Sequence, residues 1–132
     1  MNVMVDDRMR EFPLPWAAAT VVSLVASWSV PFFDAPSLVV FVMDALIVGL
    51  VQWALSRAGR PARPTVIAVS GLTSAIFLMG AVLAVVGVYP EWPMHIFLGG
   101  GLYGFAFGLL HGAAFVTVRS AMASQPGVEA EK

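Results

Sequence analysis

Four long apolar runs dominate this chain, and short segments rich in charge, proline or glycine separate them. Of its 132 residues, 59% are hydrophobic and 11% are charged, and the mean hydropathy is +0.86. A soluble domain is usually about 45–50% apolar and about 25% charged. Since a backbone in lipid has no water to bond, such runs are limited to helix. The pattern predicts an all-α fold, namely an up-down four-helix transmembrane bundle.

The runs also predict the domain organisation. We expect a polar lead over residues 1–12, a transmembrane domain over 13–119 and a flexible tail over 120–132. Because the connections are short, neighbouring helices should run antiparallel. The expected spans are residues 13–33, 37–57, 65–89 and 94–119.

The basic residues are distributed unevenly along the chain. All seven lie on the side shared by the N-terminus, the middle linker and the C-terminus, and neither hairpin turn has any. By the positive-inside rule, both termini and the linker are expected to be cytoplasmic. The excess of arginine over lysine fits a GC-rich genome, so the expected location is a bacterial inner membrane, with the chain crossing it several times. The basic residues are Arg8, Arg10, Arg57, Arg60, Arg63, Arg119 and Lys132.

Small residues recur at every fourth position of two runs. A glycine inside a helix costs about 0.5–1 kcal/mol relative to alanine in water, but in a bilayer it lets a second helix approach closely. Such faces predict helix packing, either within the chain or against a second copy, another subunit or a flat pigment ring. We call the four glycines the glycine stripe. The residues are Gly100, Gly104, Gly108 and Gly112 in the fourth run, and Ala19, Ser23 and Ser27 in the first.

Asp44 lies inside the second run, where an acid costs about 2.5–3.5 kcal/mol on insertion scales. Two interpretations are open. A protonated Asp44 would pin helices together by hydrogen bonds to Ser23, Ser27 or Tyr103, which lie at a similar depth. Alternatively, Asp44 binds a proton or a cation in a small transporter.

His111 lies in the inner third of the fourth run, at the depth of Gln52 and close to Thr73 and Ser74. It is interpreted either as a neutral histidine bonded to Gln52 or a threonine hydroxyl, or as a proton relay or axial haem ligand. The other histidine, His95, is about 24 Å away along the same helix. The two cannot ligate one haem iron in a single chain, which leaves only a haem shared across a homodimer.

The second and fourth runs end alike. Aligning Gly49 with Gly108 places Gln52 opposite His111, and an arginine follows at the exit of each run. The first and third runs do not share this offset. A duplicated hairpin is therefore a hypothesis, with an axis along the membrane normal.

Several chemistries have no sequence signal. The chain has no cysteine, which excludes disulfides and thiolate sites, and it has no phosphate-binding loop or catalytic motif. No basic patch suits nucleic acid, and no cofactor is predicted.

The leading hypothesis is a non-enzymatic accessory or structural subunit, or a self-associating packing module, with lipid and a homo-oligomer or other membrane subunits as partners. The alternative is a small proton-coupled transporter or channel using Asp44 with His111.

Overall fold

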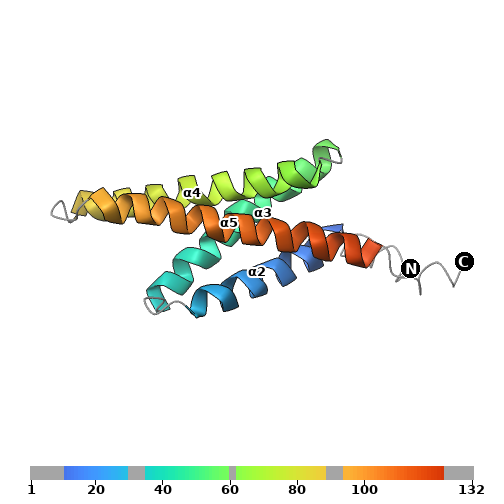
Figure 1. The fold of residues 1–132 in the computed structure, drawn as a ribbon, viewed down its shortest axis with the longest axis horizontal. Coiled ribbons are helices and arrows are strands. Elements are labelled where there is room, and N and C mark those ends of the chain that lie inside the picture. Colours follow the sequence, from blue (N-terminus) through green and yellow to red (C-terminus); the bar gives the residue numbers. More distant parts are fainter. Residues whose placement is uncertain (1–10, 30–34, 60–61, 89–93, 124–132) are drawn as a thin grey trace, which may run out of the picture.

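The computed structural model describes residues 11–29, 35–59, 62–88 and 94–123. This part of the chain forms four α-helices in up-down order, so that successive helices run in opposite directions (Figure 1). The expected all-α architecture is confirmed. The helices are α2 (Pro13–Trp28), α3 (Ala35–Ala58), α4 (Arg63–Val88) and α5 (Met94–Ala123).

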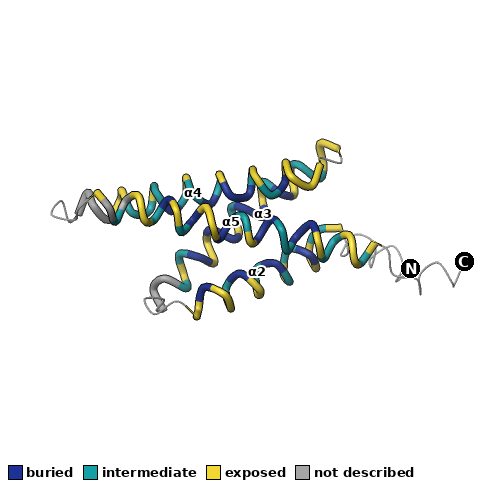
Figure 2. Tube along the Cα trace, viewed as in Figure 1, coloured by how far each residue is buried: buried dark blue, intermediate teal, exposed yellow. Residues whose placement is uncertain are grey.

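Three of the helices are long and apolar enough to cross a membrane. Their mean hydropathies over the apolar stretch are 2.3, 2.2 and 1.5. Large apolar side chains on their outer faces are exposed, and buried residues face the centre of the bundle (Figure 2). Such a surface suits lipid better than water. The membrane-length stretches are Leu38–Ala58, Arg63–Ala84 and Leu98–Ala123.

Helix α2 is shorter than the expected first span. It has 16 residues and ends at Trp28. The last turn closes because the backbone N–H and the hydroxyl of Ser29 both donate to the Ala26 carbonyl, at 3.3 and 2.6 Å. The remainder of the expected span, residues 30–33, lies outside the described residues.

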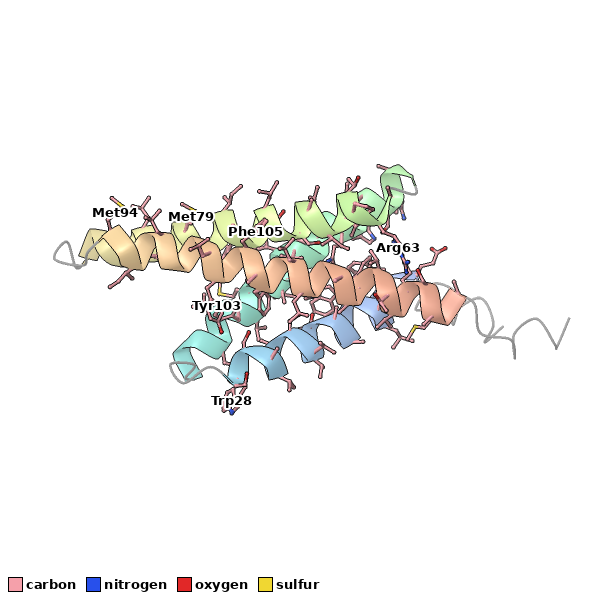
Figure 3. All side chains as sticks on the ribbon, viewed as in Figure 1. Trp28, Arg63, Met79, Met94, Tyr103 and Phe105 are labelled. Atoms are coloured by element: carbon pink, nitrogen blue, oxygen red, sulfur yellow. The ribbon has the colours of Figure 1, made fainter. Side chains whose placement is uncertain are left out.

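Helix α5 continues past the expected end of the fourth span, through residues that the sequence assigned to the tail. It ends at Ala123. Arg63, at the start of α4, donates to the Ser120 hydroxyl at 2.9 Å, and its side chain reaches toward α5 (Figure 3). Arg119 donates to the Ser56 hydroxyl of α3 at 3.2 Å. These contacts hold the last turns of α5 against two other helices.

The glycine stripe brings α4 and α5 together along most of their length (Figure 1). A Cβ atom added to Gly104 would lie 2.7 Å from the Ser74 carbonyl oxygen, and one added to Gly112 would lie 2.9 Å from the Ile67 Cα atom. One added to Gly108 would overlap the Ser70 carbonyl oxygen. At Gly100 the nearest atom is Cγ2 of the Val82 side chain, so the stripe packs on α4 of its own chain, and its last three glycines meet the backbone there.

The small residues of α2 also face inward. Ala19, Ser23 and Ser27 are all buried. Ala19 belongs to an apolar cluster near the arginine-bearing ends of the helices, which we call the inner cluster. It consists of Ala19, Val66, Phe115 and Val116. A second apolar cluster lies farther from the arginines, and we call it the outer cluster; it consists of Phe41, Leu78 and Phe107.

Replacing Gly108 with alanine should destabilise the bundle. The added methyl group meets backbone atoms of α4, which cannot turn aside, and overpacking of this kind typically costs about 1–3 kcal/mol. Gly99→Ala is the matched control, because nothing lies within 4 Å of a Cβ atom there. Thermal unfolding in lipid nanodiscs, followed by circular dichroism, measures both. Equal melting temperatures for the two variants would contradict the packing described here.

Candidate functional site

Asp44 is completely buried on α3, and its Oδ2 atom accepts a hydrogen bond from the hydroxyl of Ser74 on α4. Ser74 itself is buried, and its backbone carbonyl lies against Gly104. The carboxyl group is thus held beside the contact that α4 makes with α5 at Gly104. The expected partners at similar depth, Ser23, Ser27 and Tyr103, are not its hydrogen-bond partners among the described residues.

His111 on α5 is completely buried and uses both ring nitrogens. Its Nε2 atom lies 2.9 Å from Thr20 Oγ1, and its Nδ1 atom lies 3.1 Å from Gln52 Nε2. The Thr20 hydroxyl donates its hydrogen to the Trp16 carbonyl at 2.8 Å. Since a hydroxyl has one hydrogen, Thr20 accepts from His111 Nε2–H, and Nδ1 accepts from the Gln52 amide. The hydrogen bonds therefore assign a neutral imidazole with its proton on Nε2.

Gln52 connects this histidine to α4. Its amide nitrogen also donates to Ser70 Oγ at 3.0 Å, so both of its N–H groups are used. Ser70 lies one helical turn from Ser74, the partner of Asp44. The two hydrogen-bonded groups are thus neighbours along α4, and together they join side chains from all four helices. We call them the polar layer: Thr20, Asp44, Gln52, Ser70, Ser74 and His111.

Three buried oxygen atoms have no hydrogen-bond partner within the described part of the chain. They are Asp44 Oδ1, Gln52 Oε1 and Ser23 Oγ. An unpaired buried acceptor costs about 1–3 kcal/mol, so native structures usually provide a protein group, a water molecule or an ion. The interior consequently has two free acceptors, Asp44 Oδ1 and Gln52 Oε1, and one hydroxyl, that of Ser23, which can both donate and accept.

Apolar side chains lie on both sides of the polar layer. Along α4, Val66 and Leu78 flank the two serines at four-residue spacing, and along α5, Phe115 and Phe107 flank His111 in the same way. The Phe107 ring centroid is 6.3 Å from that of His111. The inner and outer clusters thus separate the polar layer from both ends of the bundle.

The remaining predicted site residues lie outside this layer. Tyr103 on α5 is half-buried and points toward α3, where its ring packs on Phe41 with a centroid distance of 5.2 Å (Figure 3). Thr73 is half-buried and has no hydrogen bond to the layer within the described residues. Ser27 is buried in the last turn of α2.

Sequence reasoning missed Thr20 and Ser70, and it grouped Ser74 with His111 and not with Asp44. Comparing residues by their depth along each run assumes that the helices are parallel, whereas α2 and α3 cross the α4–α5 pair at an angle (Figure 1). The four-residue spacing of Ser70 and Ser74 was a signal available in the sequence, because such residues share one helix face.

One contact agrees with a duplicated hairpin, but the packing of the two hairpins is not symmetric. Gln52 and His111, which the alignment of the second and fourth runs places opposite each other, are bonded directly. However, α4 and α5 contact each other far more extensively than α2 and α3 do. The two hairpins therefore pack differently, and a duplication stays a hypothesis.

Metal or haem ligation at His111 would require breaking the polar layer. Both ring nitrogens are engaged, so no lone pair is available to a metal. No group of three His, Cys, Asp or Glu side chains gathers anywhere in the described segments. The side chain of His95 lies outside them.

Comparisons of the chain with protein-family models, with curated proteins and with solved structures gave no match. The described part of the chain forms four helices, three of which are long and apolar enough to cross a membrane. Evidence about its function therefore comes from the side chains of the polar layer.

Thr20→Val should destabilise the protein although the two side chains have nearly the same shape. The change leaves the His111 Nε2–H group without an acceptor in the interior, which costs about 1–3 kcal/mol. Thr65→Val, at an exposed position at the start of α4, is the control. Chemical denaturation in mixed micelles compares the two. A Thr20→Val variant as stable as its control would show that the assigned hydrogen bond contributes nothing.

Proposed function

We propose that this chain is a small, non-enzymatic integral membrane protein, and that it acts as a proton-coupled transporter or channel with Asp44 as the proton- or cation-binding group. One observation carries the proposal: Asp44 is fully buried in a membrane-length helix, and one of its carboxyl oxygens has no partner. Ionisable groups inside membrane spans are rare and usually mark ion or proton pathways.

The membrane placement is supported by the helices and by the charges. Three stretches have membrane length, and α2 packs with them in up-down order. Arg57, Arg63 and Arg119 all lie at one end of the bundle, close to the connection between α3 and α4. By the positive-inside rule this end is cytoplasmic, so both termini lie in the cytoplasm and the chain crosses the membrane four times.

The layered interior supports the transport role. A proton or cation that reaches the polar layer finds Asp44 Oδ1 and Gln52 Oε1 without partners. His111 fixes the Gln52 amide by accepting one of its N–H groups, which leaves the amide oxygen as the free end. The inner and outer clusters exclude water on either side. In this proposal the structure is an occluded state, and transport requires each cluster to open in turn.

A second candidate is an accessory or packing subunit, in which the polar layer only joins helices. The observation that favours it is that the hydrogen bonds of the layer link all four helices. The glycine stripe is occupied by α4, so a partner or a second copy would have to bind elsewhere, on the exposed apolar faces.

Cysteine labelling tests the membrane topology, because the chain has no cysteine of its own. We expect Ser120→Cys to react with an impermeant maleimide only in inverted vesicles, and Ser29→Cys to react in intact cells. Both positions are exposed and lie at opposite ends of the bundle. The reverse pattern would overturn the orientation, and labelling of both from one side would overturn the four-span topology.

Asp44→Asn should abolish proton or cation flux into proteoliposomes while the protein stays folded. Asparagine can still accept the Ser74 hydrogen bond, but it cannot exchange a proton. A pH-sensitive dye inside the vesicles measures flux, and gel filtration measures folding. Asp44→Glu, which keeps the acid, should retain part of the flux. If flux through the wild-type protein and Asp44→Asn is equal, the transport proposal is wrong and the subunit candidate takes its place.

A further inference from the structure

An apolar groove opens on the outside of the bundle between α2 and α3. Its volume is about 420 Å³. Leu46 and Leu50, which form one side of it, are 52% and 66% exposed. The polar layer does not contribute to it. The lining residues are Phe12, Trp16, Leu46, Gly49, Leu50 and Trp53.

The wall of the groove is built so that it presents no polar group. The indole N–H of Trp16 donates to the Ala45 carbonyl at 2.9 Å. The ring can lie this close to α3 because Gly49 has no side chain; a Cβ atom there would overlap the indole. The hydrogen-bonding capacity of Trp16 is thus used within the protein, and the groove accepts only apolar groups.

A cation lies at one end of this groove. Leu46, Leu50, Trp53 and Arg57 are spaced four, three and four residues apart, so they share one face of α3. Arg57 lies in the last turn of α3 and is exposed, with its guanidinium carbon 5.3 Å from the centroid of the Trp53 ring. The groove therefore runs along α3 toward a positive charge at the arginine-bearing end of the bundle.

The chemistry of this face identifies the ligand that fits it. An apolar channel that ends at an arginine complements a molecule with a hydrocarbon chain and an anionic head. A helix from a second copy would satisfy the apolar part but not the charge, and the phosphate of a zwitterionic lipid is already offset by the ammonium group of the same headgroup. Arginine binds phosphate through its forked N–H groups, at the depth where lipid headgroups lie.

We propose that the groove between α2 and α3 is a binding site for an anionic phospholipid, with one acyl chain against Leu46, Leu50 and Trp53 and the phosphate on Arg57. The site rests on the membrane placement proposed above and not on the transport role. It would tie the lipid composition of the inner leaflet to the spacing of α2 and α3, because Trp16 and Phe12 form its second wall.

Native mass spectrometry of the full chain, taken from nanodiscs with equal amounts of phosphatidylglycerol and phosphatidylcholine, tests the site. We expect retained phosphatidylglycerol on the wild-type protein. Arg57→Gln should lower the preference for phosphatidylglycerol about fivefold, the loss of one interfacial cation. Arg63→Gln removes the same charge from an exposed arginine that bonds Ser120 and does not line the groove, and it should keep the preference.

Leu50→Trp is the second variant, since it fills the groove at an exposed position and does not disturb the core. It should reduce retention of both lipids. If Arg57→Gln and Arg63→Gln lower the preference equally, the attraction is a general effect of charge and the site is refuted. Unchanged lipid retention in Leu50→Trp would also refute the site. Displacement of the lipid by millimolar inorganic phosphate would refute it too, because it would indicate a headgroup site that does not use the groove. Flux through Asp44 is measured separately, so failure of either proposal is recognised independently.

Discussion

The close approach of α4 to α5 along the glycine stripe is the contact on which the rest of the structure depends. A helix without side chains on one face can touch the backbone of its neighbour, and here Gly104 and Gly108 lie against the carbonyls of Ser74 and Ser70. In lipid, where the hydrophobic effect does not drive helices together, such packing is a main source of association. It also fixes the position of both serines, and these serines hold Asp44 and Gln52.

The polar layer shows how an apolar bundle accommodates polar side chains. Hydrogen bonds between membrane helices contribute only about 0.6–2 kcal/mol each. Their main effect is therefore on the register of the helices, and their contribution to stability is small. A shift of one helix by a single turn would leave His111, Gln52 or Asp44 without partners. The layer therefore selects one register for the four helices. The exceptions within the layer are two oxygens without a hydrogen-bond partner among the described residues, Asp44 Oδ1 and Gln52 Oε1.

The interior site and the outer groove use α3 in different ways. One face of the helix carries Asp44 and Gln52 into the bundle, and another carries Leu50, Trp53 and Arg57 to the outside. Gly49 lies between these faces and admits the Trp16 indole. The spacing of α2 and α3 at this point thus affects both the polar layer, through Thr20, and the groove, through Trp16.

The sequence by itself determined the helical class, the order of the four described helices and the polar side chains that cost the most free energy to bury. These follow from local properties: the length of apolar runs, the positions of prolines and charges, and the preference of lipid for helix. It also paired Gln52 with His111, because both lie near the same end of their runs. The extension of α5 to Ala123 was not visible, since it depends on the bonds of Arg63 and Arg119 to other helices.

Only the tertiary structure decided which partners the polar groups take and which surface the glycines use. The crossing angle of α2 and α3 against the α4–α5 pair places Thr20 on His111 and Ser74 on Asp44, and a count of residues along each helix contains no information about that angle. A glycine stripe is equally suited to a neighbour in the same chain and to a second copy. Here α4 fills it, because the short connection to α5 keeps the two helices adjacent at no cost in association entropy.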